Sequence, residues 1–326
     1  MNISIDGNLK SYIEGLIEQK QSIGYPYNTP AQILKRFSVF CMNYFPEGTT
    51  LTKEMAMRWA EKRPGEHANT LLRRITPVRQ LAKYMNRMGI AAYLIPNKIP
   101  AKVIRYVPHI FTDQELRAFF KEIDRCTPSP YSGPVRHLII PVFFRLLYCC
   151  GLRSSEARLL NVADVDLESG KLIIRQSKGN KDRHVMMSED VLHLCRVYDS
   201  KVRQIFPARL AFFPNPLGQH YHCNIIDYWF HLFFNKTAFA NGKSGNPPRV
   251  HDFRHTFAVK RLNLWVQEGK DLQAYLPYLS MYLGHAHLVA TDYYLHFVPE
   301  FFPLFKEKTQ ENCAPLIPEV NHEDGE

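Results

Sequence analysis

A histidine and an arginine three positions apart, His251 and Arg254, are followed by His285 and then by Tyr294. If a helix begins at Asp252, the first two side chains share one face of its first turn, where backbone N–H groups also attract an anion. This pattern favours a phosphate ligand. A tyrosine hydroxyl, with a pKa of about 10 when free, attacks phosphorus only where neighbours stabilise the phenolate and the charge of the transition state. Other parts of the chain must then supply further cations.

The spacing of this pair is weak evidence alone, because the chain has a second His-x-x-Arg pair, His193 and Arg196. The second pair lies in an apolar stretch, Val191 to Val197, whose periodicity predicts an amphipathic helix with both polar side chains on its solvated face. We interpret it as ordinary surface. The context of the first pair differs, since several polar motifs accompany it.

The first of these motifs places an arginine at a predicted helix entrance. An apolar helix is predicted to end at Gly151, and Arg153 stands at the start of the next one. Glu156, three residues on, can cap that helix or hold an arginine. Arg153 and Glu156 could equally form a plain ion pair at a helix start. The other motifs decide between a functional arginine and a plain ion pair.

A lysine follows at the tip of a predicted hairpin. Two β-prone runs, residues 171–176 and 183–187, flank a Gly-Asn turn, which predicts antiparallel strands with Lys178 at their exposed end. A lysine there is a cation on a flexible stem that can reach a bound backbone. Lys181, after the turn, is the alternative, and either lysine could instead be a solvated turn residue.

The order and spacing of these motifs closely resemble the tyrosine recombinase (phage-integrase-like) family. The resemblance rests on Gly-Leu-Arg-x-x-Glu, His-x-x-Arg, Leu-Gly-His and a tyrosine nine residues after that histidine, and it covers about residues 105 to 300. It implies a site-specific recombinase or integrase that breaks and rejoins DNA through a 3′-phosphotyrosine and leaves a free 5′-hydroxyl. The catalytic residues that it implies are Arg153, Lys178, His251, Arg254, His285 and Tyr294.

The cations suit this chemistry on physical grounds. The planar guanidinium groups of Arg153 and Arg254 can each bind non-bridging oxygens of a phosphate and stay protonated at working pH. Lys178 suits protonation of the leaving 5′-oxygen, because the pKa of a lysine falls when it is desolvated or near other cations. A phosphotyrosine retains the energy of the broken phosphodiester, so we expect no nucleotide, metal or other cofactor.

The histidines and tyrosines would share the proton transfers. His251 is the better candidate for a general base toward Tyr294, and His285 for a donor to the transition-state oxygens, although the two roles could be exchanged. His285 could also be an ordinary buried histidine. Tyr293 competes with Tyr294 as the nucleophile. The spacing from His285 favours Tyr294, and Tyr293 is expected in the core.

Length and charge predict two domains and an anionic partner. The chain has 326 residues and a net charge of +10. Residues 1–104 carry fifteen Lys and Arg against seven Asp and Glu, whereas residues 299–326 carry two against seven. We predict a mainly α fold with a small antiparallel β-sheet. A helical core DNA-binding domain would span residues 1–104, and a mixed α+β catalytic domain residues 105–326.

Helical patterns fill the first domain, over residues 9–18 and 29–45, after a capping Thr52, and over residues 69–88, where Pro77 must begin or kink a helix. The last stretch carries basic residues, much of it at helical spacing, which we interpret as contacts to DNA phosphates. An ordinary solvated basic face is the alternative. These basic residues are Arg73, Arg74, Arg79, Lys83 and Arg87.

Three local patterns complete the second domain. Thr112 and Glu115 form a capping-box pair that predicts a helix through Phe120. Residues 126–134 are rich in proline and predict a loop between helices. Trp229 lies among aromatic residues that we expect in the core rather than stacked on bases.

The segment from Phe297 to Phe305 is unusually apolar for a surface terminus, so it needs a place to be buried. Recombinases of this resemblance dock such a tail on a neighbouring protomer, which implies a homo-tetramer on synapsed double-stranded DNA sites; folding back onto the same protomer is the alternative. Seven cysteines without a C-x-x-C pair favour a cytoplasmic setting. Pro141 and Arg145 interrupt the longest apolar stretch, which argues against a membrane span.

Three rival functions fit the sequence less well. A type IB topoisomerase would use the same chemistry as a monomer, but the hairpin lysine and the aromatic tail fit recombination better. A DNA-binding regulator without catalysis conflicts with the presence of all six polar residues. A metal site at His220 and His222, or at His285 and His287, lacks an accompanying carboxylate or cysteine set.

Overall fold

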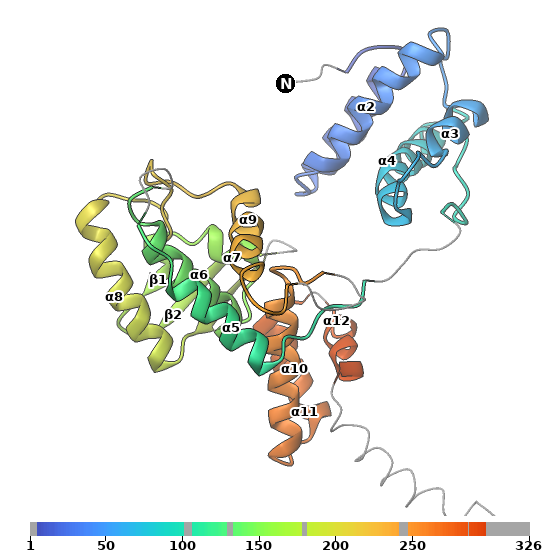
Figure 1. The fold of residues 1–326 in the computed structure, drawn as a ribbon. Coiled ribbons are helices and arrows are strands. Elements are labelled where there is room, and N and C mark those ends of the chain that lie inside the picture. The colour runs from blue at the N-terminus through green and yellow to red at the C-terminus, as the bar shows by residue number, and fades with distance from the viewer. Residues whose placement is uncertain are drawn as a thin grey trace, which may run out of the picture. The chain divides into compact units, whose positions relative to one another are not determined.

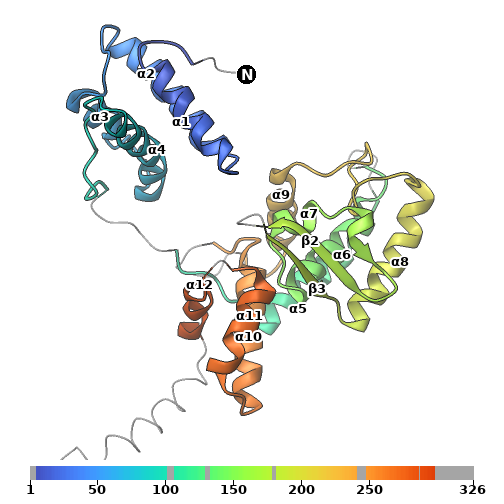
Figure 2. The same cartoon turned by 180° about the vertical axis from the view of Figure 1, so that it is seen from behind.

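The computed structural model describes residues 5–100, 106–128, 133–177, 181–240, 247–285 and 287–297. The chain forms two compact units, Met1–Tyr106 and Val107–Glu326 (Figures 1 and 2). Each unit buries an apolar core of its own. The mainly helical fold with a small antiparallel sheet is confirmed.

The first unit is helical throughout its described residues. Its helices are α1 (Lys10–Ser22), α2 (Asn28–Tyr44), α3 (Lys53–Ala60) and α4 (Ala68–Arg87). α4 packs against each of the other three. Their shared core includes Leu34, Phe37, Trp59 and Ile75, all nearly or fully buried. This apolar interior packs the helices together.

The helix boundaries follow local signals. The Thr52 hydroxyl accepts a hydrogen bond from the backbone N–H of Met55 at 3.3 Å, which confirms the predicted cap of α3. α4 continues through Pro77, so the alternative that a helix begins at this proline is wrong. Pro77 itself is buried in the core, and its packing there offsets the hydrogen bond that its ring nitrogen cannot donate.

The second unit combines helices with one small sheet. Its first elements are α5 (Asp113–Asp124), α6 (Arg136–Cys149), α7 (Ser154–Arg158), η1 (Val162–Asp164), β1 (Val165–Asp166), β2 (Lys171–Ser177) and β3 (Lys181–Met186). The remaining ones are α8 (Glu189–Ile205), α9 (Cys223–Phe234), α10 (Asp252–Gln267), α11 (Leu272–Leu283), α12 (Val289–Asp292) and η2 (Tyr293–Phe297).

The sheet has the order β1-β2-β3, with both pairs antiparallel. In the hairpin β2–β3, Leu172 pairs with Val185 and Ile174 with Arg183. The apolar side chains of this face are buried in the main core, while the register shifts between Ile174 and Ser177. The predicted hairpin is confirmed, and β1 is an addition that the sequence did not indicate.

An aromatic core anchors the start of α10. Phe253, fully buried, contacts the rings of Phe111, Phe119, Phe144 and Phe230, with ring centroids between 4.8 and 5.9 Å apart. Aromatic pairs of this kind each add about 0.5–1.5 kcal/mol beyond their buried area. Because Phe253 stands directly before Arg254, these contacts fix where the first turn of α10 presents its polar side chains.

A second apolar cluster joins α10, α11 and η2, and Figures 1 and 2 show α10 and α11 side by side. It contains Val259 and Leu262 of α10, Leu279 and Leu283 of α11, and Tyr294 of η2. A tyrosine far along the chain is thereby held against the helix that carries His251 and Arg254.

Several local predictions are confirmed. The Thr112 hydroxyl and the Glu115 carboxylate form the capping box of α5, which runs four residues beyond Phe120. Trp229 is 2 % exposed and belongs to the core. The described residues of the 126–134 stretch lie between α5 and α6. In the described part of the chain, no helix is both long enough and apolar enough to cross a membrane.

Candidate active site

Arg153 lies at the predicted helix entrance. Gly151 ends the preceding segment with φ +60°, a left-handed conformation that favours glycine, and a Cβ there would lie 2.5 Å from the Phe257 ring. Arg153 is the N-cap of α7, and its backbone N–H donates to the Glu156 carboxylate at 2.8 Å. Its Nη1 donates to the same carboxylate at 2.6 Å. Glu156 therefore both caps α7 and forms an ion pair with Arg153, so the two alternatives raised by the sequence occur together.

Arg254 is the most deeply buried cation of this site, with 1 % of its side chain exposed. Its Nη1 donates to the carbonyl of Gly151 at 2.8 Å and lies 3.9 Å from Glu156, while its Nη2 donates to the carbonyl of Leu283. Burial and the nearby charge of Arg153 lower its pKa to about 10. The guanidinium therefore remains charged at neutral pH, held by backbone oxygens on two sides.

The C-terminal end of α11 organises three arginines at once. Consecutive carbonyls of residues 282–284 accept hydrogen bonds, in chain order, from Arg183 Nε at 2.8 Å, from Arg254 Nη2 and from Arg153 Nη2 at 3.0 Å. Carbonyls at a helix C-terminus lack partners within the helix and carry partial negative charge. The Leu-Gly-His motif thus supplies the backbone that orients the cations, in addition to its histidine.

Arg183 was not recognised as a site residue from the sequence. Its Nη1 and Nη2 each donate to one oxygen of Glu156 at 2.8 Å, so the guanidinium holds the carboxylate in bidentate fashion. Burial alone would raise the pKa of Glu156, but the hydrogen bonds and charge of Arg183, with Arg153 and Arg254, lower it to about 2. Glu156 is therefore an anion at the centre of a cationic cluster.

The structure brings the Tyr294 hydroxyl to His255. The hydroxyl oxygen lies 3.0 Å from Nδ1 of His255, a residue that sequence reasoning passed over although it directly follows Arg254. His251, the predicted base, contacts the His255 ring edge to face at 4.7 Å. His251 keeps part of its surface exposed to solvent.

His285 completes the cluster from the far side of Tyr294. Its Nδ1 lies 2.7 Å from the Thr291 hydroxyl, and its ring lies 6.1 Å from the Tyr294 ring at an interplanar angle of 24°. Tyr294 is 2 % exposed, whereas Tyr293 is only partly buried and contacts Phe297. Tyr293, predicted to be in the core, is partly buried and packs against the second apolar cluster, and Tyr294 is the more deeply buried of the two.

The electrostatics keep the proton carriers of the site neutral. Burial, together with neighbouring charges, lowers the pKa of His255 and of His285 to about 3. Partial desolvation and the charges of Arg254 and Arg153 also lower the pKa of His251. Burial raises the pKa of Tyr294, although Arg254 and Arg153 oppose the shift. At neutral pH the tyrosine is a protonated hydroxyl beside neutral imidazoles.

Two predicted features lie outside the described residues. Lys178 is one of residues 178–180, which follow Ser177 at the end of β2 and precede Lys181 at the start of β3. The tail at 299–326 is likewise not described. The structure therefore brings together five of the six predicted catalytic residues.

A basic cleft in the first unit

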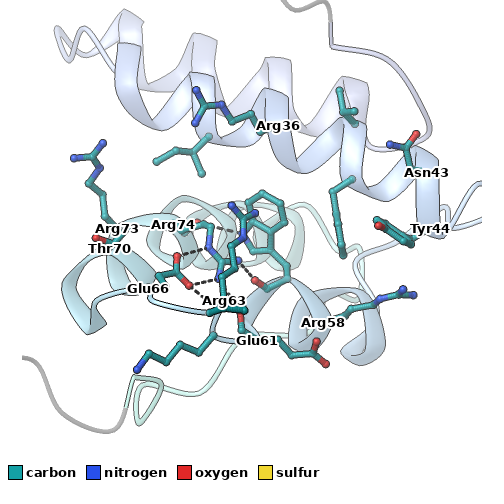
Figure 3. A pocket seen from close by; sticks show the side chains of 16 residues that line it. Arg36, Asn43, Tyr44, Arg58, Glu61, Arg63, Glu66, Thr70, Arg73 and Arg74 are labelled. Carbon is teal, nitrogen blue, oxygen red and sulfur yellow. Dashed lines mark hydrogen bonds and ion pairs between the residues drawn. The ribbon is translucent and has the colours of Figure 1, made fainter.

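A cleft of about 670 Å³ opens between α2, α3 and the start of α4 in the first unit (Figure 3). Arg36 and Arg73 lie along it in Figure 3, and the Arg58 guanidinium stacks 4.2 Å above the Tyr44 ring. The basic residues that line the cleft are Arg36, Arg58, Lys62, Arg63, Arg73 and Arg74, against Glu61 and Glu66. The cleft is therefore a cationic surface.

The five basic residues predicted on α4 divide into two groups. Arg73, Lys83 and Arg87 are exposed, and their spacing places them on one side of the helix. Arg74 instead holds Glu66 through Nε at 2.9 Å and Nη2 at 2.8 Å. Arg79 donates to backbone carbonyls, including that of Ile99 at 2.6 Å. Arg74 and Arg79 thus support the fold of the unit.

Arg74 makes further contacts with the cleft floor. It donates to the carbonyls of Trp59 and Glu61, the latter at 2.8 Å, and its guanidinium lies 5.2 Å from the Trp59 ring centroid. Figure 3 shows its hydrogen bonds as dashed lines beside Glu66. Arg74 lines the cleft while its guanidinium is engaged with Glu66 and the backbone.

The positions of the other histidine motifs show what each of them does. His193 and Arg196 are exposed on α8, and Arg196 donates to the carbonyls of residues 167 and 168, which confirms the surface interpretation. His222 accepts a hydrogen bond from the backbone N–H of Asn224 at 3.5 Å, at the start of α9. In the described ranges, no three His, Cys, Asp or Glu side chains gather as a metal site would require.

Relationship to known proteins

The profile of the phage integrase family matches residues 110–300, which is more than half of the chain. A protein of Sinorhizobium fredii named as an integrase/recombinase, y4rE, is 31% identical over 287 residues, covering 87% of this chain and 90% of its own. The chain belongs to the phage integrase family. It is a tyrosine recombinase, an enzyme that cleaves and rejoins DNA strands at specific sites.

Solved structures support the same fold. The XerH site-specific recombinase bound to its difH substrate has a TM-score of 0.61 at 20% identity, covering 95% of this chain and 84% of that one. A lambda integrase tetramer bound to a Holliday junction has a TM-score of 0.58 at 15% identity, covering 88% and 76%. At these identities the likeness extends to the fold alone.

Proposed function

We propose that Tyr294 is the nucleophile of this recombinase and that Arg153 and Arg254 bind the scissile phosphate. The observation that carries the proposal is the convergence of both guanidinium groups on the end of α11, beside the tyrosine hydroxyl. Attack by the Tyr294 oxygen on phosphorus forms the 3′-phosphotyrosine and breaks the bond to the 5′-oxygen. The broken strand is then left with a free 5′-hydroxyl.

The arginines stabilise the charge that develops on phosphorus. Arg254 is almost fully buried and Arg153 largely so, and a cation in such a place acts more strongly on a bound anion than it would in water. Glu156 balances part of their charge before DNA binds, and Arg183 holds Glu156 still. The cations are therefore oriented before the substrate arrives, which limits reorganisation during the reaction.

His251 and His285 would donate hydrogen bonds to the phosphate oxygens. A neutral imidazole carries one N–H donor, and the contact of His285 Nδ1 with the Thr291 hydroxyl fixes its ring. Lys178, carried over from the family resemblance, would protonate the leaving 5′-oxygen from the hairpin tip. The reaction as proposed uses no metal and no other cofactor, because the phosphotyrosine conserves the energy needed for rejoining.

The first domain, residues 1–104, would grip double-stranded DNA while residues 105–326 act on it. Arg73, Lys83 and Arg87 are exposed on one side of α4, where they can reach successive phosphates. The cationic cleft beside Arg73 extends this surface. Arg74 and Arg79 act here by supporting the fold, which narrows the set of direct DNA contacts to three of the five basic residues.

We further propose a homo-tetramer on two synapsed sites, linked by the tail at 299–326. The apolar run that begins at Phe297 supports this assembly, and the solved lambda integrase complex is described as a tetramer on a Holliday junction. The acidic residues of the tail complement the basic charge of the rest of the chain. A cytoplasmic location fits free cysteines and a DNA substrate.

The target sequence can be selected by the reaction itself. We would incubate the protein with duplexes that carry a random central segment and a nick, then denature the mixture and sequence the DNA covalently joined to protein. The nick lets the short 5′-hydroxyl strand diffuse away, so the adduct accumulates. An adduct that persists in EDTA supports the proposal, and no adduct from any duplex would refute it. Plasmid relaxation without strand exchange would instead indicate a topoisomerase.

A further inference from the structure

Two polar side chains of α10, His255 and Arg254, lie against the Tyr294 hydroxyl. Nδ1 of His255 lies 3.0 Å from the hydroxyl oxygen, and the His255 and Tyr294 ring centroids are 5.5 Å apart. The aromatic anchor at Phe253 and the salt-linked Arg254 beside it fix the turn of α10 from which His255 projects. The contact therefore joins two well-held parts of the second unit.

The hydrogen bond has a defined direction. Burial, together with the charges of His251, Arg249 and Arg254, lowers the pKa of His255 to about 3, so its ring is neutral near pH 7. Tyr294 keeps its proton because burial raises its pKa. A neutral ring with its proton on Nε2 accepts from the tyrosine O–H through Nδ1. The tyrosine oxygen, which also accepts from Arg254, keeps a lone pair for attack.

We propose that His255 is a catalytic residue that accepts the hydroxyl proton of Tyr294 during strand cleavage. The Tyr294 O–H bond breaks and its proton moves to Nδ1 of His255 as the tyrosine oxygen bonds to phosphorus. The bond from phosphorus to the 5′-oxygen breaks, and that oxygen takes a proton from the general acid. In rejoining, the 5′-hydroxyl attacks, and the His255 imidazolium returns its proton to the tyrosine oxygen.

The bound phosphate would supply the driving force for this transfer. The groups that face or surround His255 are Arg249, His251 and Arg254 on and before α10, Tyr294 on η2, and His285 after α11. The arginines among them disfavour an imidazolium while no anion is bound. A phosphate on Arg254 adds negative charge and offsets that effect. His255 thus becomes a stronger base when the substrate is in place.

His251 fits this role less well. It contacts the His255 ring edge to face, whereas it is His255 whose Nδ1 lies at hydrogen-bonding distance from the Tyr294 hydroxyl. Geometry places a general base within hydrogen-bond reach of its proton. His251 remains suited to donating to phosphate oxygens, and the two histidines then act on different atoms.

This inference rests on Tyr294 being the nucleophile, and the test separates the two claims. The probe is a nicked duplex recovered by the selection described above. The rate of covalent adduct formation is measured at saturating protein from pH 6 to 9 for the wild type, His255→Gln, His255→Ala and the control His193→Ala. Gln can accept a hydrogen bond but cannot take a proton, so it separates base catalysis from positioning.

We expect His255→Gln to form the adduct at least about 100-fold more slowly at pH 7, in line with the loss of a general base. Its rate should then rise about tenfold per pH unit, because hydroxide must remove the proton. His193→Ala should match the wild type, since His193 is exposed on α8. Rejoining of the purified adduct with a 5′-hydroxyl strand should slow by a similar factor.

Two results would overturn the inference. One is a His255→Gln rate within about threefold of the wild type, and the other is a slow rate that does not rise with pH in a variant that still binds the duplex, which would mark a positioning role. If His255→Ala does not fold, the test uses His255→Gln, whose side chain is closer in size to histidine. An adduct that Tyr294→Phe still forms at the wild-type rate refutes the proposed nucleophile instead, so the failure of that proposal is distinguishable from the failure of this one.

Discussion

Both oxygens of Glu156 are held by the guanidinium of Arg183, each at 2.8 Å. This buried pair joins the start of α7 to strand β3, and Arg183 also reaches the end of α11 through its Nε. Three segments that are distant in sequence are therefore tied at one point. Arg153 and Arg254, which would bind the phosphate, both contact Glu156 at this junction.

Removal of Arg183 should destabilise the second unit. Arg183→Ala leaves the Glu156 carboxylate buried without its main partner, and we expect the free energy of unfolding to fall by about 3–5 kcal/mol. Arg183→Lys keeps the charge but cannot bind in bidentate fashion, so it should recover only part of the loss. Urea unfolding of the isolated variants measures both. A loss below about 1 kcal/mol for Arg183→Ala would contradict this account of the junction.

Acid should weaken the same junction. The folded-state pKa of Glu156 is about 2 against an ordinary value of 4.5. A lowered pKa gives stability that is complete above pH 4.5 and is lost as the pH falls through about 2. We expect roughly 3 kcal/mol from this group. Glu156→Gln should flatten the unfolding free energy over that range; an unchanged slope would argue that other carboxyls dominate.

Gly151 should tolerate no side chain. Its φ of +60° and the nearby Phe257 ring predict that Gly151→Ala costs more than the strain of a left-handed alanine, which is about 1–2 kcal/mol. Gly269 is the matched control, since its φ is +68° but no atom lies within 4 Å of its Cβ position. Thermal unfolding of the two alanine variants should differ clearly. Equal losses would show that the Phe257 contact relaxes.

The basic residues of α4 should separate by function. Arg73→Ala is expected to weaken DNA binding and to reduce the salt dependence by about one phosphate contact, with the first unit still stable. Arg74→Ala should destabilise the unit, because Glu66 and two backbone carbonyls lose their donor. Binding titrations at several salt concentrations, alongside unfolding curves, distinguish them. The opposite pattern would place Arg74 at the DNA.

Local signals in the sequence located much of the site. The three-residue spacing of Arg153 and Glu156 was enough to predict a capped helix entrance, since such a cap depends only on neighbours along the chain. The helix from Asp252 was assumed from the spacing of His251 and Arg254, and α10 does begin at Asp252, without a side-chain cap. The hairpin around the Gly-Asn turn was equally readable.

Contacts between distant segments could not be read in this way. Arg183 meets Glu156 across 27 residues, and His255 meets Tyr294 across 39. Both residues had ordinary local explanations, one in a strand and one in a helix. Arg74 was predicted as a DNA contact because its helical position suggested an exposed cation. In the structure its side chain instead binds Glu66. Side-chain direction depends on tertiary packing that periodicity does not contain.

The covalent adduct tests the central claim most directly. The selected nicked duplex is incubated with the wild type, Tyr294→Phe and Tyr293→Phe, and the DNA-linked peptide of the wild type is identified by mass spectrometry. We predict a phosphodiester on Tyr294, no adduct from Tyr294→Phe, and an adduct from Tyr293→Phe, because it is the Tyr294 hydroxyl that lies against His255. A DNA-linked peptide modified at Tyr293, or an undiminished adduct from Tyr294→Phe, would contradict the account.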